Sequence, residues 1–143
     1  QNTIKVFMKT GFKLVYTTTI PVRWGDMDSL AHVNNTVYFR YMEQSRVEWF
    51  AQGGFNAHDK GSGPLLAHAE CNFRKPVLYP ATVEVRLYAG VPGNTSLPLF
   101  QEIRVQGEDA VYADGLSRVV WFDHRAGKTI SVPDGLRKLI AKK

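Results

Sequence analysis

A chain of 143 residues that is 44% hydrophobic and 12% aromatic has the size and composition of one domain with a buried core. Its 18 Lys and Arg and its 13 Asp and Glu are scattered, and the net charge of +5 is too diffuse to indicate a nucleic-acid groove. The single cysteine excludes an internal disulfide framework and a Cys-rich zinc site.

We therefore expect one domain over residues 1–143, with residues 1–12 as an N-terminal extension that is poorly ordered or was added ahead of a native start at Met8. The sequence has no long apolar run and no signal-peptide pattern, so neither a membrane span nor secretion is expected. A lone cysteine suits a reducing compartment, and the expected location is the cytoplasm.

In chain order, the first predicted element is a strand over residues 13–24, which are rich in β-branched and aromatic types. Pro21 within it favours an edge strand or a bulge. The apolar spacing then becomes helical, which predicts a helix over roughly residues 35–52 that Gly53-Gly54 can end. The predicted stripe of this helix consists of Tyr38, Tyr41, Met42, Ser45 and Trp49.

Alternation with a period of two dominates the rest of the chain and predicts further strands. These expected strands cover residues 67–74, 82–87, 97–105 and 110–122. The apolar face of the first of them consists of Ala67, Ala69, Cys71 and Phe73. Pro133 then opens a short C-terminal helix.

The predicted fold class is α+β: a curved antiparallel sheet of about five strands wrapped around one long helix, with a short C-terminal helix. One helix on one face leaves two sheet edges and much of the other face uncovered. Self-association is therefore expected.

Residues 24–35, WGDMDSLAHVNN, place two carboxylates, a histidine and two asparagines just ahead of the predicted helix. Asp26 and Asp28 lie on the same side if the backbone stays extended, so their repulsion could raise one pKa and make that group a better base or nucleophile. Alternatively, both acids serve only to stabilise the helix start or to form a turn. Together with His32 they carry metal-ligating atoms, but no further ligand stands at a suitable spacing, and no metal site is expected.

The start of the predicted helix is a second candidate for chemistry. Free N–H groups around residues 34–36 carry partial positive charge and can polarise a carbonyl oxygen or hold an oxyanion. Asn34 or Asn35 can instead cap those N–H groups, and the two interpretations can hold together. Other nucleophile machinery is missing, because there is no Gly-x-Ser-x-Gly elbow and Cys71 is expected to be a buried small hydrophobe.

The segment Gly25-Asp26-Met27-Asp28, followed by His32-Val33-Asn34-Asn35 and the long helix, resembles the hotdog-fold acyl-CoA thioesterases of the 4-hydroxybenzoyl-CoA thioesterase type. Residues 72–77 (NFRKPV) are similar to the family's strand after the helix, and residues 93–96 (GNTS) to its turn before a central strand. The resemblance covers about residues 14–124.

This resemblance implies hydrolysis of an acyl-CoA to a free acid and CoA by a homodimer or homotetramer. Asp28 would be the catalytic carboxylate, the backbone N–H near Asn35 the oxyanion donor, and His32 a third candidate catalytic residue. CoA is part of the substrate, and no cofactor, metal, nucleic acid or membrane partner is implied. The expected substrate-binding residues are Asn34, Tyr38, Thr95, Ser96, Arg74 and Lys75.

The sequence departs from the family pattern at two places. Ala31 stands where a glycine is common, and Leu78-Tyr79-Pro80 replaces the usual Gly-Asp turn. Neither departure touches Asp28.

Two other functions compete with thioester hydrolysis. A hydratase or dehydratase of the same fold would be expected to pair a histidine with an acid on the helix, and Glu43 has no helical histidine nearby. The other is a non-catalytic module that binds acyl-CoA or acyl-carrier protein, against which the presence of Asp28 argues. Whether Asp28 is a nucleophile or a general base stays open.

Overall fold

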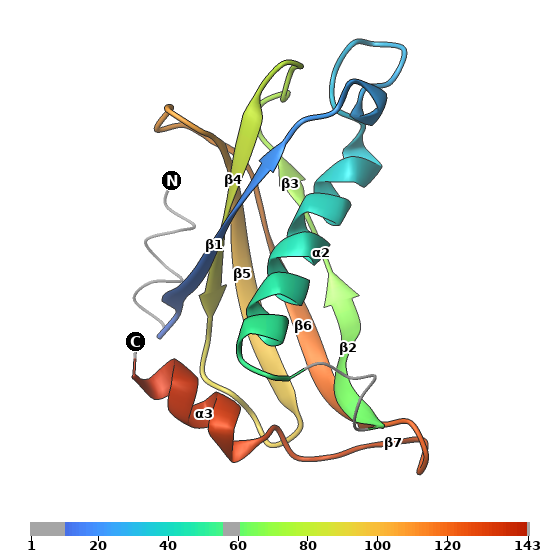
Figure 1. Ribbon diagram of the computed structural model, residues 1–143, viewed down its shortest axis with the longest axis vertical. Helices are drawn as coiled ribbons and strands as arrows, with labels where there is room; N and C mark the ends of the chain where they lie inside the picture. Colours follow the sequence, from blue (N-terminus) through green and yellow to red (C-terminus); the bar gives the residue numbers. More distant parts are fainter. Residues whose placement is uncertain (1–10, 56–60, 143) are drawn as a thin grey trace.

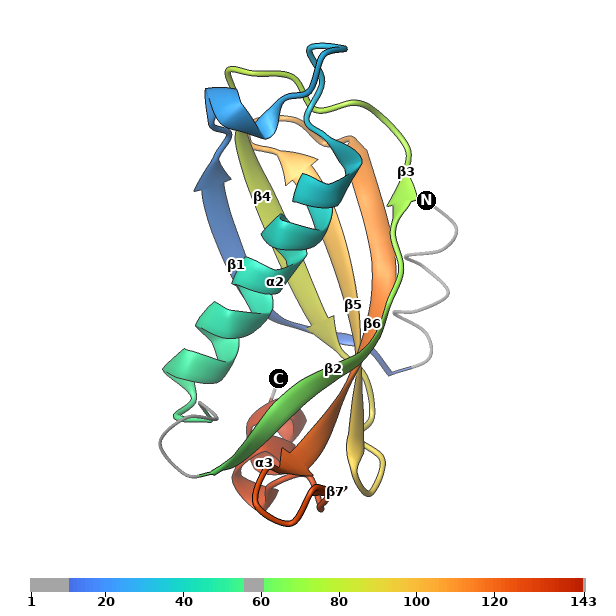
Figure 2. The ribbon, with the colours of Figure 1, turned by 90° about the vertical axis from the view of Figure 1, so that its right-hand side faces the viewer.

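The computed structural model describes residues 11–55 and 61–142, so the predicted extension lies almost wholly outside the described residues. A curled antiparallel sheet wraps around one long helix (Figures 1 and 2), which confirms the predicted α+β architecture. The sheet order is β1-β4-β5-β6-β2, and the short strands β3 and β7 also pair with β6. The strands are β1 (Lys13–Pro21), β2 (Ser62–Ala69), β3 (Asn72–Phe73), β4 (Thr82–Ala89), β5 (Ser96–Val105), β6 (Val111–Asp123) and β7 (Lys128–Thr129).

The long helix α2 (Asn35–Gln52) lies against the concave face of the sheet, with Asn34 as its N-cap and Gly53 as its C-cap. All members of the predicted stripe are buried. The C-terminal helix α3 (Asp134–Ala141) follows Pro133, as predicted, and lies at the end of the sheet opposite the start of α2 (Figure 1).

The core between α2 and the sheet consists of two apolar clusters. The first surrounds Trp49 on the C-terminal half of α2 and includes Leu97 and Leu99 of β5. The second surrounds Tyr38, Tyr41 and Met42 and includes Ile103 of β5. Buried polar side chains of three elements stand between the two clusters: Ser45 and Arg46 on α2, Gln101 on β5 and Ser117 on β6.

The predicted strand over residues 67–74 is wrong in two respects. It divides into β2 and β3, and at the break the carbonyl oxygen of Glu70 lies only 1.9 Å from where a Cβ of Gly115 would lie. Its apolar face is also only partly covered, since Ala67 is exposed and Phe73 is 49% exposed, whereas Ala69 and Cys71 are half-buried. Strand β2 is an edge of the sheet, and its Leu65 and Leu66 are exposed as well.

Candidate active site

The connection from β1 to α2 carries the residues that the sequence singles out. Strand β1 ends at Pro21, earlier than predicted, and a short 3-10 helix, η1 (Trp24–Asp26), follows. Met27 then forms an antiparallel bridge with Val33. Between them the chain turns back, with the N–H of Ala31 donating to the carbonyl oxygen of Asp28 at 3.0 Å. This turn lies beside the start of α2 at the upper end of the molecule in Figure 1.

Asp26 is buried and fully engaged. Its Oδ2 accepts hydrogen bonds from the Tyr41 hydroxyl at 2.9 Å and from the N–H of Arg23 at 3.0 Å. The guanidinium of Arg23 lies 3.3 Å from Oδ1. Burial, followed by the bond to Asp26, raises the pKa of Tyr41, so the phenol stays a donor. Asp26 therefore ties the β1–α2 connection to the middle of the helix.

Asp28 is exposed, in contrast to its neighbour. Its Oδ1 accepts from the N–H of Leu30 at 3.0 Å, and its Oδ2 accepts from the Asn34 side-chain amide at 3.1 Å. These two bonds, that of Leu30 first, hold the pKa of Asp28 below its ordinary value. The idea that repulsion between the two acids raises this pKa is wrong, because η1 breaks the extended backbone and only Asp26 faces inward.

Asn34 connects Asp28 to the start of α2. Its Oδ1 accepts from the N–H of Thr36 at 2.9 Å and from the Thr36 hydroxyl at 2.6 Å, while its amide donates to Asp28. In the part of the chain that the structure describes, the N–H of Asn35 has no acceptor. One side chain thus caps the helix, while the adjacent backbone N–H stays free at the positive end of the helix. That N–H can polarise a carbonyl oxygen.

A cavity of about 220 Å³ lies beside this start, and we call it the helix-start cavity. His32, Asn35 and Tyr38 line it on one side. Tyr38 is itself buried, and its hydroxyl accepts from the N–H of Val77 at 3.0 Å, so its main role is to brace the neighbouring loop. The other lining residues are Val33, Phe73, Arg74, Lys75 and Pro76.

The two cations of the helix-start cavity already have partners. Arg74 donates to both carboxylate oxygens of Asp114, at 2.8 and 3.0 Å, which raises the pKa of its guanidinium. Lys75 places its ammonium 4.9 Å from the centre of the Tyr112 ring. Neither arrangement prevents a contact with a ligand, but Arg74 is held in place by its ion pair.

Within one copy of the chain, Thr95 and Ser96 do not lie near Asp28 and the helix start. Thr95 ends the β4–β5 connection and Ser96 is the first residue of β5, and the carbonyl oxygen of Thr95 accepts from the N–H of Trp121 at 2.8 Å. This connection is at the opposite end of the sheet from Asp28 (Figure 1). Their predicted contact with substrate would need a second copy of the chain.

Cys71 is half-buried, and burial raises the pKa of its thiol to about 12. It is therefore protonated at neutral pH and unsuited to act as a nucleophile. Among the described residues, no group of three or more His, Cys, Asp or Glu side chains could hold a metal ion. No described helix is long and apolar enough to cross a membrane.

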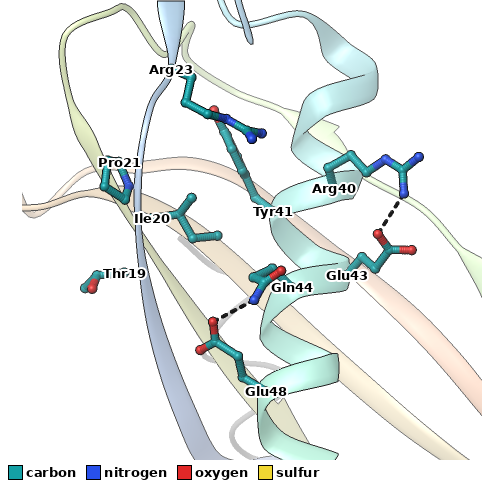
Figure 3. A pocket seen from close by; sticks show the side chains of 9 residues that line it. All are labelled: Thr19, Ile20, Pro21, Arg23, Arg40, Tyr41, Glu43, Gln44 and Glu48. Atoms are coloured by element: carbon teal, nitrogen blue, oxygen red, sulfur yellow. Dashed lines mark hydrogen bonds and ion pairs between the residues drawn. The ribbon is translucent and has the colours of Figure 1, made fainter. Parts of the chain in front are cut away.

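Two further hollows flank α2, one on each side. The larger, of about 550 Å³, lies between β1 and α2 (Figure 3), and we call it the β1 groove. Its carboxylate Glu48 accepts hydrogen bonds from Thr18 at 2.9 Å, from Gln44 at 2.8 Å and from Tyr16 at 3.3 Å. The Glu48 carboxylate on this side of the helix is therefore hydrogen-bonded by donors of the same chain.

The smaller hollow, of about 180 Å³, lies between α2 and β2, and we call it the β2 cavity. It runs from Thr36, in the first turn of α2, to the buried Arg46. Sequence analysis missed Arg46. Its position one helical turn after Met42 in the predicted stripe is the signal that places it at the margin of the buried face.

Comparisons with known proteins agree with this geometry. A family model for the thioesterase-like superfamily matches residues 22–140. The PA2801 protein of Pseudomonas aeruginosa, a candidate thioesterase, is 42% identical with a TM-score of 0.86, and the match covers 90% of this chain and 99% of that one. A candidate acyl-CoA thioesterase from Xanthomonas campestris is 34% identical with a TM-score of 0.70, covering 78% and 95%. A gentisyl-coenzyme A thioesterase shares the fold, with 24% identity, a TM-score of 0.77 and coverage of 85% and 99%.

Proposed function

Because the family model matches most of the chain, the protein belongs to the thioesterase-like superfamily and has the hotdog fold, and we propose that it hydrolyses an acyl-CoA to a free acid and CoA. One observation carries the proposal. Asn34 links the carboxylate of Asp28 to the helix start, where the N–H of Asn35 is free among the described residues. A carboxylate can act as nucleophile or base in acyl transfer, and an unpaired helix N–H beside it can stabilise the oxyanion.

In the proposed reaction the thioester carbonyl oxygen accepts a hydrogen bond from the N–H of Asn35. Asp28 either attacks the carbonyl carbon, giving a mixed anhydride that water cleaves, or takes a proton from water, whose oxygen then attacks. In both routes the C–S bond breaks and the sulfur leaves as a thiolate, which takes up a proton. With a leaving-group pKa near the cysteine value of about 8.5, the thiolate needs no strong general acid.

The exposure of Asp28 bears on this mechanism. A hydrated carboxylate with a lowered pKa is charged at neutral pH but is a weak nucleophile and base. We infer that bound acyl-CoA, together with a second copy of the chain, removes water from it. His32, on the wall of the helix-start cavity, stays a candidate for contact with the reacting group.

The uncovered edge strand supports a homodimer or a larger homo-oligomer. Leu65, Leu66 and Phe73 are 43%, 45% and 49% exposed on and next to β2, and an edge strand offers unpaired backbone groups to a second edge. In such an assembly Thr95 and Ser96 of one copy could reach the substrate held by the other. Arg74 and Lys75 would then meet the CoA phosphates at the helix-start cavity.

The test is thiol release from short, medium, long and aromatic acyl-CoAs by the wild type and by Asp28→Asn. Asparagine keeps the Oδ1 that accepts from Leu30, so the turn should persist while kcat falls on the order of a thousandfold. Glu43→Gln is the matched control, because Glu43 is an exposed carboxylate of α2 that lines both flanking hollows.

Three outcomes would contradict the proposal in distinguishable ways. Equal rates for the wild type and Asp28→Asn would remove the catalytic role from Asp28. A loss confined to Glu43→Gln would transfer that role to the helix. Tight binding of acyl-CoA without any thiol release would instead favour the non-catalytic module, for which an exposed Asp28 that merely shapes a turn is sufficient.

A further inference from the structure

Arg46 is a buried cation without an anionic partner. Its side chain is 8% exposed, and in the described part of the chain no carboxylate lies within ion-pair distance of it. Its one hydrogen bond runs from Nη1 to Oε1 of Gln101 at 3.2 Å. A buried charge is costly unless an opposite charge or several hydrogen bonds compensate it.

Gln101 is fixed independently of Arg46. Its amide donates to the carbonyl oxygen of Met42 at 2.7 Å and to the hydroxyl of Ser45 at 2.6 Å, and its Oε1 also accepts from Ser117 at 3.2 Å. The guanidinium of Arg46 is therefore held only through Nη1, and its other N–H groups have no acceptor among the described side chains. They are not sealed in the core, because the guanidinium lines the β2 cavity.

The β2 cavity extends from Thr36, the residue after the proposed oxyanion donor, to this cation. Thr36 at one end directly follows Asn35, whose N–H is the proposed oxyanion donor. Phe39, Leu66 and Ala69 form apolar walls along it. The eleven steps along the helix from Asn35 to Arg46 correspond to roughly 16 Å, and the Arg46 side chain, which leans toward the N-terminus, shortens that span.

The other charges on the cavity cancel. Arg40 donates to Glu43 at 2.9 Å, and both side chains are largely exposed at the cavity mouth. Among the described residues of the lining, Arg46 is then the charged side chain that has no ion pair, although Glu43 attracts it from a greater distance. An apolar passage that ends at a guanidinium fits a chain with a carboxylate at its far end, because Arg forms paired hydrogen bonds with carboxylates.

We propose that Arg46 is a specificity-determining residue that binds the distal carboxylate of the acyl group, so that the preferred substrates are acyl-CoAs of dicarboxylic acids. This inference rests on the proposed thioesterase function and names its substrate class. The competing source of the anion is a carboxylate of a second copy of the chain across β2. The passage from Thr36 to Arg46 favours the substrate.

The experiment compares acyl-CoAs matched in length: hexanoyl with adipyl, and octanoyl with suberyl. In the wild type the dicarboxylic member of a pair should have the higher kcat/KM, by about tenfold or more, since a buried polar group rejects an analogue that cannot pair with it. Arg46→Met should reverse this preference, mainly through KM. Arg46→Lys should restore part of it, because the charge returns without the paired donors.

Arg46→Met is expected to fold, because an apolar side chain of similar length often replaces a buried charge without loss of stability, and Gln101 keeps its other partners. Light scattering of each variant reports the assembly. Selectivity unchanged in Arg46→Met, or a change of molar mass without a change of selectivity, would overturn the assignment. Turnover of uncharged chains only would refute this inference alone, whereas no turnover of any thioester would refute the proposed function with it.

Discussion

Asp26 and Asp28 are separated by one residue, yet the fold treats them in opposite ways. Asp26 is 6% exposed and takes hydrogen bonds from Tyr41 and from the backbone of Arg23. Asp28 lies on the surface and takes hydrogen bonds from Leu30 and Asn34, both of the loop that contains it. The partners of the first carboxylate fix the helix to the β1–α2 connection, whereas those of the second leave the carboxylate exposed beside the helix start.

Within one short segment, Asp26 therefore contributes to stability, whereas Asp28 is the acid available for chemistry. A buried carboxylate whose donors come from a connecting segment and a helix is part of the core, and its loss leaves those donors unpaired. An exposed carboxylate can be changed at little cost in stability. Substitutions can therefore test the two acids separately, with stability measured for Asp26 and activity for Asp28.

The largest effect on folding is expected for Asp26→Asn. Tyr41 and the N–H of Arg23 both donate to Oδ2, and an asparagine oxygen in its place would still accept from them, but as a neutral and therefore weaker acceptor. The asparagine NH2 would also replace Oδ1 beside the Arg23 guanidinium, so that attraction is lost. The free energy of unfolding should fall by about 2–3 kcal/mol, the range for bonds to a buried charged group. Urea unfolding measures this, with Asp28→Asn as the control that should lose much less stability, because that carboxylate is exposed. Equal urea midpoints for the two variants would mean that Asp26 and Asp28 do not differ in their contribution to stability.

A smaller loss is expected for Tyr41→Phe. This change keeps the ring of Tyr41 in its apolar cluster and removes only the hydroxyl that donates to Asp26 at 2.9 Å. Asp26 keeps the N–H of Arg23, so the loss should be about 1–1.5 kcal/mol. Thermal unfolding of Tyr41→Phe, Asp26→Asn and the double variant forms a cycle. Additive effects would show that the two side chains do not act through their shared bond.

Sequence reasoning located α2, narrowed its cap to Asn34 or Asn35 and gave the order of the main elements, because these follow from local spacing and capping chemistry. It did not predict that Asp26 is buried and Asp28 exposed. The burial of Asp26 depends on the turn at η1 and on the hydrogen bond from Tyr41, a tertiary contact that no local sequence pattern contains. It also missed Arg46 and the exposure of Phe73. Both depend on which elements cover a surface, and an edge strand shows the same alternation as a covered one.

Asn34→Ala should affect both the helix and Asp28. Loss of the cap on Thr36 should lower the free energy of unfolding by about 1 kcal/mol. Loss of the bond to Oδ2 should also raise the pKa of Asp28 toward its ordinary value of 3.8. The stability that Asp28 contributes is present above the unfolded pKa and is lost as pH falls through the lowered folded pKa. NMR titration of the Asp28 carboxyl carbon checks the shift; a titration identical to the wild type would mean that Leu30 alone sets this pKa.

The smallest effect is expected for Ala31→Gly, in the turn that presents Asp28. Ala31 has a φ of 59°, so it adopts the left-handed conformation that glycine favours and that the resemblance to the thioesterase family expects at this position. An L-residue is destabilised there by about 1–2 kcal/mol, but glycine gains entropy in the unfolded chain, which offsets most of the benefit. The net gain should be about 0.5 kcal/mol in urea unfolding. The turn bond from Ala31 to Asp28 is made by the backbone and should persist, so kcat should not change. A large change in kcat with unchanged stability would instead mean that the methyl group of Ala31 helps to orient Asp28, and the turn could no longer be regarded as a passive support.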